Sequence, residues 1–217
     1  FPEIDRQLRH REGRPNQIDL ALQQDRSTEE YKALLISLQE DHDRLSRLVG
    51  QLLLLFRAER IQEQRVEPVD LLEVVDNAIE GSRSEYPGTT IELDFTRMPE
   101  DPEELTIQGN AALLLSAVQN LVSNACKYGA GGKVSIHIDP QPKTVIISIA
   151  NGGALIPAEE RDKIFQPFYR SSNHGDKSGF GLGLLLAKKI ASLHDGDLTY
   201  IPAGTLNRFL LTPPKKA

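Results

Sequence analysis

The sequence predicts an α+β protein in two parts. The first is an N-terminal helical hairpin that forms a four-helix bundle on dimerisation. The second is an α/β sandwich with a mixed sheet covered by helices on one face. A single apolar stripe at three- and four-residue steps runs through residues 29–60. From Pro68 onward, short alternating segments typical of strands mix with amphipathic segments typical of helices. We therefore expect the hairpin over residues 1–60, a linker over 61–67 and the second domain over 68–217.

Residues 29–60 are expected to form one long helix. Ser27 or Thr28 can cap it, with Glu30 as the reciprocal acceptor of a capping box. A shorter helical segment, residues 16–24, precedes it across a short turn. The apolar stripe of the long helix consists of Leu34, Leu38, Leu45, Leu48, Val49, Leu52, Leu55 and Phe56.

A hairpin this long and thin cannot bury its apolar stripe alone. Pairing of two copies into a four-helix bundle is the expected solution, so we predict a homodimer through the hairpin. A monomeric hairpin folded onto the second domain is the alternative.

The second domain is expected to alternate between helices and strands. An amphipathic helix should end at Gly81, because glycine favours the residue after a helix. The expected strands 133–138 and 144–150 are close enough for a β-hairpin, but the prolines between them weaken this signal. The expected helices cover residues 69–79, 110–127 and 184–193, and the expected strands cover residues 89–95, 133–138, 144–150 and 206–212.

Composition narrows the function classes without selecting one. The chain has 217 residues and a formal net charge of −6, which argues against nucleic acid as a partner. Its one cysteine, Cys126, excludes an internal disulfide framework and suits a reducing compartment. The longest aliphatic run, residues 52–55, is far too short to span a bilayer.

Chemistry is concentrated in two motifs. Asn120 and Asn124 are four residues apart on one face of a predicted helix, and Lys127 follows three residues later. A carboxamide oxygen is a neutral, hard ligand that suits Mg²⁺ bound to phosphates, and the lysine ammonium can meet phosphate charge. About fifty-five residues on, residues 179–183 read Gly-Phe-Gly-Leu-Gly at the start of an apolar helix, where backbone N–H groups favour an anion. Together the motifs indicate a nucleotide site, whereas an isolated asparagine pair would more often be solvated surface.

With these motifs the chain resembles the sensor histidine kinases of two-component systems, which belong to the ATPases of the Bergerat fold. Residues 120–128 resemble the N box, 149–157 the G1 box, 164–170 the F box and 179–183 the G2 box, in the family's order. Gly109-Asn110 is similar to the family's Gly-Asp before the N box. The resemblance implies ATP and Mg²⁺ as cofactors, a dimerisation and histidine-phosphotransfer hairpin, an ATP-binding catalytic domain, and a response-regulator receiver domain as partner.

The resemblance also implies roles for individual residues. Asn124 would be the Mg²⁺ ligand. Asn151 stands where most of the family has an aspartate that accepts a hydrogen bond from the adenine amino group, and an amide oxygen can accept the same bond. This G1 form looks like that of the copper and heavy-metal sensor kinases. The full set of expected nucleotide-binding residues is Asn120, Asn124, Lys127, Tyr128, Asn151, Gly153, Arg170, Gly179, Gly181, Leu182 and Gly183.

Residues 171–178 are polar and without periodicity, and they resemble the family's ATP lid. Arg170 or Lys177 could reach phosphate from there, or each is an exposed charge without a role. Tyr128 lines the base pocket or packs the helix end. His174 and His194 are expected to have no catalytic role.

The phosphoacceptor is where the chain departs from the family pattern His-(Glu/Asp)-x-x-(Thr/Asn)-Pro. His10 keeps the spacing to Pro15, but Arg11 replaces the acidic neighbour and Arg14 replaces the residue linked to phosphatase activity. Three alternatives stay open: His10 is the acceptor, no competent acceptor exists, or His42 on the long helix takes the role.

We expect an ATP-dependent protein-histidine kinase core that autophosphorylates and passes phosphate to a response-regulator aspartate. Because the chain begins at Phe1, we expect the cytoplasmic portion of an inner-membrane receptor, attached to the membrane only through absent segments. The first alternative is a dimerising, ATP-binding scaffold without autophosphorylation. The second is a Bergerat ATPase of another class, such as a chaperone or topoisomerase, against which the hairpin and linker argue.

Overall fold

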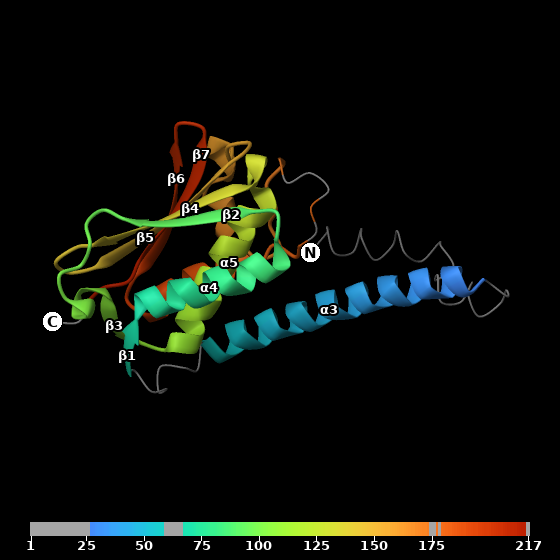
Figure 1. The fold of residues 1–217 in the computed structure, drawn as a ribbon, viewed down its shortest axis with the longest axis horizontal. Helices are drawn as coiled ribbons and strands as arrows, with labels where there is room; N and C mark the ends of the chain where they lie inside the picture. Colours follow the sequence, from blue (N-terminus) through green and yellow to red (C-terminus); the bar gives the residue numbers. More distant parts are fainter. Residues whose placement is uncertain (1–26, 59–66, 174–176, 178, 216–217) are drawn as a thin grey trace. The chain divides into compact units, whose positions relative to one another are not determined.

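The computed structural model describes residues 27–58, 67–173, 177 and 179–215, and the chain divides into two compact units, residues 1–50 and 51–217 (Figure 1). The short predicted helix over residues 16–24 and most of the predicted linker lie outside the described residues, as does His10. Among the described helices, none has the length and apolar character needed to cross a membrane.

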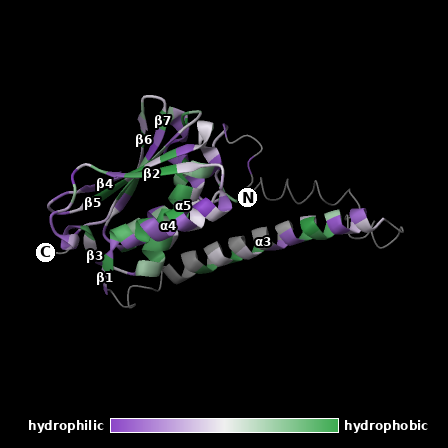
Figure 2. Cartoon of the chain, viewed as in Figure 1, coloured by the Kyte–Doolittle hydropathy of each residue, from purple (hydrophilic) through white to green (hydrophobic). Residues whose placement is uncertain are grey.

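The long predicted helix is confirmed as α3 (Thr28–Ala58). Its start has the expected capping box: the Glu30 N–H donates to Ser27 Oγ at 3.2 Å, and the Ser27 N–H donates to Glu30 Oε2 at 2.8 Å. Both apolar and polar residues are coloured along α3 (Figure 2). The exposed apolar side chains of its described residues include two members of the predicted stripe, Leu45 at 58% and Val49 at 46%. A second copy of the hairpin would cover such a stripe, and the dimer stays a prediction.

The second unit holds a five-stranded mixed sheet with the strand order β2-β4-β5-β7-β6 (Figure 1). Only β2 and β4 pair in parallel, and the other neighbours are antiparallel. The strands are β2 (Thr90–Phe95), β4 (Lys133–Pro140), β5 (Val145–Gly152), β6 (Asp197–Ala203) and β7 (Leu206–Thr212).

Three helices accompany this sheet, namely α4 (Leu71–Glu85), α5 (Ala111–Tyr128) and α6 (Gly183–Leu193). Between them run single turns of 3-10 helix, which are η2 (Pro102–Leu105), η3 (Ala130–Gly132), η4 (Ala158–Glu160) and η5 (Lys163–Phe165).

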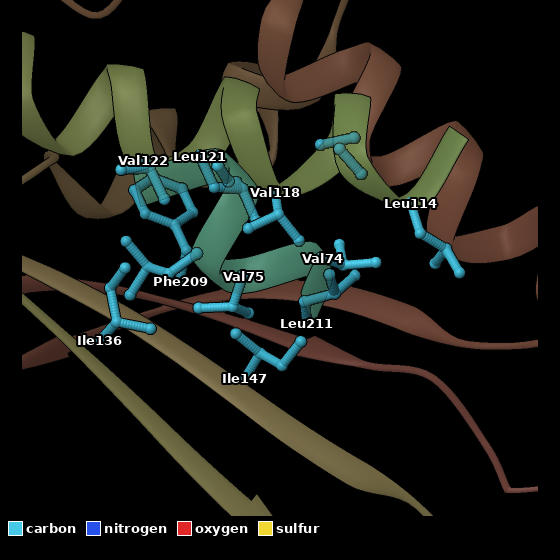
Figure 3. Packing of buried hydrophobic residues seen from close by; sticks show 14 of the residues in the cluster. Val74, Val75, Leu114, Val118, Leu121, Val122, Ile136, Ile147, Phe209 and Leu211 are labelled. Atoms are coloured by element: carbon cyan, nitrogen blue, oxygen red, sulfur yellow. The ribbon is translucent and has the colours of Figure 1, made fainter. Parts of the chain in front are cut away.

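The core lies between one face of the sheet and the helices. Side chains of β4, β5 and β7, among them Ile136, Ile147 and Phe209, point toward Val75 of α4 and Leu121 of α5 (Figure 3). In β4 and β7 buried residues alternate with less buried ones, as expected when successive side chains point to opposite faces of a sheet. The predicted α+β class, with a mixed sheet covered by helices on one face, is therefore confirmed.

One small sheet was missed by the sequence prediction. β1 (Glu67–Asp70) pairs antiparallel with β3 (Thr106–Gly109), and Glu67, which was expected in the linker, lies opposite Gly109. Four-residue strands without alternation give no periodic signal, and proline is rare inside strands. The last antiparallel partner in the main sheet, β6, was missed as well.

The predicted boundaries of α4 were wrong at both ends. The helix begins at Leu71 because the Asp70 side chain accepts a hydrogen bond from the Leu72 N–H at 2.8 Å, which leaves Val69 in β1. It continues past Gly81 to Glu85, and Ser82 is buried on the same face. A Cβ at Gly81 would meet only Gln119 Nε2 at 3.5 Å, so this glycine is accommodated inside the helix.

Candidate functional site

Helix α5 carries the paired asparagines, and its start is fixed by Asn110, whose side chain accepts a hydrogen bond from the Leu113 N–H at 3.1 Å. Asn120 is half-buried and donates from Nδ2 to the Ser116 carbonyl at 2.8 Å. A Cβ on Gly183 would lie 2.7 Å from Asn120 Oδ1. The Asn120 carboxamide is therefore packed closely against the first residue of α6, and a larger residue there would displace it.

Asn124 and Lys127 follow on the next turns of α5. Asn124 is half-buried. Lys127 Nζ lies 5.5 Å from the centre of the Tyr128 ring, and a Cβ on Gly179 would lie 2.9 Å from this ammonium. The lysine of the first motif and the first glycine of the second are therefore neighbours in space.

The turn after β5 packs onto the end of α5. Asn151 is the next-to-last residue of β5 and is 4% exposed. Its Nδ2 donates to the Gly152 carbonyl at 2.7 Å. Gly153 has a φ of +130°, and a Cβ there would lie 2.9 Å from the Tyr128 carbonyl oxygen. Residues 151–153 thus lie beside the end of the helix that carries Asn124 and Lys127.

The segment before α6 is held by Phe168 and Gly181. The Phe168 N–H donates to the Gly181 carbonyl at 3.1 Å. Gly181 has a φ of +70°, and a Cβ there would lie 2.5 Å from the Tyr169 carbonyl oxygen. Leu182 is buried, with 1% of the residue exposed, so its side chain is not available to a ligand. No side chain caps the N-terminus of α6, which leaves backbone N–H groups for an anion.

Arg170 and Lys177 form a chain of contacts that ends at α5. The Arg170 guanidinium donates to the Lys177 carbonyl, and Lys177 Nζ donates to the Lys127 carbonyl. Lys177 Nζ also lies 5.5 Å from the centre of the Tyr128 ring. Tyr128 is therefore flanked by two ammonium groups, which makes this end of α5 electropositive.

Glu160 ties the start of the polar segment to the 3-10 turn before the predicted F box. Its carboxylate accepts hydrogen bonds from the Ser171 hydroxyl and from the Ser172 N–H. The hydrogen bond from Ser171, followed by the contact with Ser172, holds the pKa of the Glu160 carboxyl below its ordinary value.

The one cysteine, Cys126, is buried in α5. Burial raises the pKa of its thiol, so this cysteine is an inert packing residue.

Close approaches thus link Asn120 to Gly183, Lys127 to Gly179 and Tyr128 to Gly153, while His10 lies outside the described residues. The full set of eleven nucleotide-binding residues stays a prediction. His42 is exposed on α3. Within the described part of the chain, no three histidine, cysteine, aspartate or glutamate side chains cluster as a metal site. A donor set of one carboxamide beside phosphate oxygens and water fits Mg²⁺, which is bound in this way at many nucleotide sites.

Three residues near the site make structural contacts that the sequence did not indicate. His194, expected to have no catalytic role, accepts a hydrogen bond at Nε2 from the Asn110 N–H. Tyr200 and Asn207 bond the turn that follows Asn151. Their partners lie 84, 44 and 53 residues away respectively, so no local pattern could have indicated them.

Comparison with known proteins agrees with this geometry. The family model described as "Histidine kinase-, DNA gyrase B-, and HSP90-like ATPase" matches residues 109–217. The sensor protein CutS of Streptomyces coelicolor is 34% identical over 165 residues, which is 74% of this chain and 38% of CutS. The chain thus spans about two-fifths of the length of this curated relative.

Two solved structures extend the comparison. The mycobacterial sensor histidine kinase MprB is 28% identical, with a TM-score of 0.61 over 68% of this chain and 97% of the other. The histidine kinase ThkA in complex with the response regulator TrrA shares the fold at 22% identity, with a TM-score of 0.67 over 88% of this chain and 53% of the other. The matched family model covers half of the chain, and the chain therefore belongs to the histidine kinase-, DNA gyrase B- and HSP90-like ATPases, on their sensor histidine kinase branch.

Proposed function

We propose that this chain is the catalytic core of a two-component receptor that binds Mg²⁺–ATP at the site described, phosphorylates a histidine of its own hairpin and passes the phosphoryl group to an aspartate of a response regulator. The convergence of α5 and the glycines before α6 carries the proposal. Lys127 Nζ lies at Gly179, and Asn120 Oδ1 lies at Gly183. A cation thus lies beside the glycine segment that leads into the uncapped start of α6, and this combination favours phosphate binding.

Asn151 would read the adenine base. Because its Nδ2 is bonded to the Gly152 carbonyl, Oδ1 is the atom that its side chain presents to the adenine amino group. The bond would be neutral, since an amide replaces the family's usual carboxylate. Gly153 lets the backbone approach the base closely, because its φ of +130° and the nearby Tyr128 carbonyl exclude a side chain.

The phosphate end would be held by α5 and by the start of α6. Lys127 would bind phosphate oxygens, while the backbone N–H groups at Gly183 would meet the charge of the triphosphate. Asn124 would hold Mg²⁺, which when bound neutralises phosphate charge during phosphoryl transfer. Lys177 is placed beside Lys127 and is a second candidate cation for the phosphates.

The phosphoryl acceptor in this proposal is His10. Its neutral imidazole nitrogen would form a bond to the γ-phosphorus as the bond to the bridging oxygen breaks and ADP leaves. Arg11 and Arg14 would favour the neutral imidazole and attract phosphate, but neither can take its proton. These two substitutions are also what favours the second candidate, a dimerising scaffold that binds ATP without phosphorylating itself.

The proposed partners follow from the hairpin and from the relatives. The exposed apolar residues of the α3 stripe, such as Leu45 and Val49, support a homodimer through the hairpin. ThkA, which shares the fold, was solved in complex with the response regulator TrrA, and this supports a receiver domain as the partner here. We propose that the chain is the cytoplasmic part of an inner-membrane receptor, joined to the membrane by other segments.

Incubation with γ-labelled ATP and Mg²⁺ tests the proposal. The parent and the Gln119→Ala control, which removes an exposed carboxamide from the same helix, should acquire acid-labile label. Asn124→Ala should lose label together with Mg²⁺-dependent ATP affinity, and His10→Ala should lose label while ATP affinity is retained. His42→Ala should keep the label.

Each contrary result has a definite meaning. A parent that binds ATP but takes no label is the scaffold. If the label is lost in His42→Ala and kept in His10→Ala, His42 on α3 is the phosphoacceptor. A parent that binds no ATP would refute the nucleotide site itself.

A further inference from the structure

A buried network of three hydrogen bonds joins the last two strands to the turn after β5. The Ile156 N–H donates to the Tyr200 hydroxyl at 3.1 Å, the Tyr200 hydroxyl donates to Asn207 Oδ1 at 2.8 Å, and Asn207 Nδ2 donates to the Ala154 carbonyl at 3.2 Å. Tyr200 is 9% exposed and Asn207 6% exposed. Neither residue was among the expected site residues.

The direction of every bond in this network is fixed by chemistry. A backbone N–H can only donate, so the Tyr200 oxygen must accept from Ile156. The Tyr200 hydroxyl then donates its hydrogen bond to Asn207 Oδ1, which fixes the orientation of the Asn207 amide. Its Nδ2 therefore faces the Ala154 carbonyl, which is an acceptor. The network has one consistent arrangement, and a buried polar group loses its partner if any member is removed.

The network holds the residues that follow Asn151, the residue proposed to bind the adenine base. Asn207 of β7 lies directly opposite Asn151 of β5 in the sheet register. Residues 154 and 156, which the network holds, follow Asn151 and Gly153 in the same turn. Backbone outside regular structure has no hydrogen-bond ladder of its own, so side-chain contacts such as these two restrain its conformation.

The Ala154 carbonyl has a second amide donor. Asn173 Nδ2 donates to it at 3.2 Å and to the Leu155 carbonyl at 2.9 Å. Asn173 belongs to the exposed polar segment before α6, whereas Asn207 belongs to the buried sheet. The buried donor is therefore the fixed reference for the turn.

We infer that Tyr200 and Asn207 are positioning residues that set the backbone of the turn at residues 152–157 and, through it, the adenine selectivity of the site. The inference rests on the proposed nucleotide function, since it assigns the base contact to Asn151 and Gly153. Neither Tyr200 nor Asn207 contacts the nucleotide in this scheme. They act by holding the turn in the one geometry that fits adenine, which reduces the conformational cost of binding.

Titration of ATP and of GTP against the full chain tests this inference. Tyr200→Phe removes only the hydroxyl and keeps the ring against Phe209, whose centroid is 5.3 Å away. ATP affinity should fall about tenfold and the preference for ATP over GTP should shrink by a similar factor. Asn207→Asp keeps the acceptor for Tyr200 and removes the donor to Ala154, so it should lower the preference in the same direction. The double variant should lose less than the product of the two effects, because both act through one network.

Tyr86→Phe is the matched control. The Tyr86 hydroxyl is 3.1 Å from Ser123 Oγ, so this variant also removes a part-buried hydroxyl contact, but between α4 and α5. It should leave the ATP-to-GTP ratio unchanged. Amide hydrogen exchange at Ile156 supplies a readout without nucleotide, and exchange there should accelerate in Tyr200→Phe and stay slow in the control.

The outcomes separate the two proposals. Absence of ATP binding by the parent overturns the proposed function and this inference together. A parent that binds ATP, with Tyr200→Phe and Asn207→Asp retaining its ATP-to-GTP ratio, overturns this inference alone. A lowered melting temperature with unchanged selectivity also overturns it, because the network would then serve stability only. If Tyr200→Phe does not fold, the ratio in Asn207→Asp decides by the same criterion.

Discussion

His194 Nε2 accepts a hydrogen bond from the Asn110 N–H at 3.0 Å, while its Nδ1 lies 2.8 Å from the Ile190 carbonyl oxygen. Since a carbonyl can only accept, Nδ1 carries the proton and Nε2 is the acceptor, which requires a neutral imidazole. Asn110 caps α5, the helix of the paired asparagines. The residue that ends α6 thus fixes the start of α5, while Gly183 at the other end of α6 lies against Asn120 in the middle of α5.

Substitution of Gly109 should test this junction. A Cβ at Gly109 would lie 2.6 Å from His194 Cδ2, so Gly109→Ala must displace the imidazole or the backbone. We expect a loss of about 1–3 kcal/mol in the free energy of unfolding, measured by urea denaturation. Gly88→Ala, where a Cβ has nothing within 4 Å, is the control and should change stability by less than about 0.5 kcal/mol. Equal effects of the two variants would contradict the close contact.

Substitution of Gly81 should have the opposite sign. Gly81 lies inside α4, and the nearest atom to an added Cβ is Gln119 Nε2 at an ordinary 3.5 Å. Gly81→Ala should therefore stabilise the protein by about 0.5–1 kcal/mol, because alanine has the higher helix propensity. Thermal denaturation measures this change. A destabilised variant would show that the helices α4 and α5 approach more closely than the contact indicates.

The stability of the region before β3 should depend on acid pH through Glu104. Its hydrogen bond from Arg97, together with backbone N–H donors, lowers the pKa of the Glu104 carboxyl from 4.5 to about 2. A carboxyl whose pKa is depressed on folding contributes stability above its unfolded pKa and loses it as pH falls through the folded value. Stability should therefore decline between pH 4.5 and about 2.

Urea denaturation across this pH range checks the prediction. Glu104→Gln should flatten the decline, whereas Glu103→Gln, one residue earlier on the same 3-10 turn, should keep it. A parent and a Glu104→Gln variant with the same slope would refute the assignment to Glu104.

Removal of the Lys127 ammonium should weaken ATP binding without unfolding the protein. Its Nζ is half-exposed beside Gly179, so Lys127→Met should raise the dissociation constant for ATP about tenfold, which is about 1.4 kcal/mol. Lys133→Met is the control, because Lys133 Nζ is paired with Glu92 at 2.8 Å in the exposed start of β4. Fluorescence titration with an ATP analogue compares the two. Similar ATP affinities in the two variants would show that Lys127 does not bind the nucleotide.

The sequence could predict elements whose signal is local. The periodicity of α5 and the glycines of residues 179–183 indicated the phosphate end of the proposed site, because helical spacing and bare backbone are properties of neighbouring residues. β1 and β3 could not be found in this way, since each is stable only because the other pairs with it. The contacts of His194 and Tyr200 could likewise not be identified from the sequence, because their hydrogen-bond partners lie far along the chain.

The single parallel pair of the sheet has a kinetic consequence. The β4–β5 and β6–β7 pairs join strands that are neighbours along the chain, whereas β2 can meet β4 only after β3 and all of α5 have crossed between them. Hairpins close in microseconds, but non-local parallel pairing first requires a long loop to be ordered. The β5–β7 pair is non-local as well, since Ile147 is paired with Leu211. Two long loops must therefore be ordered before the sheet is complete, and each contains one of the two helices, α5 and α6, that would hold the nucleotide.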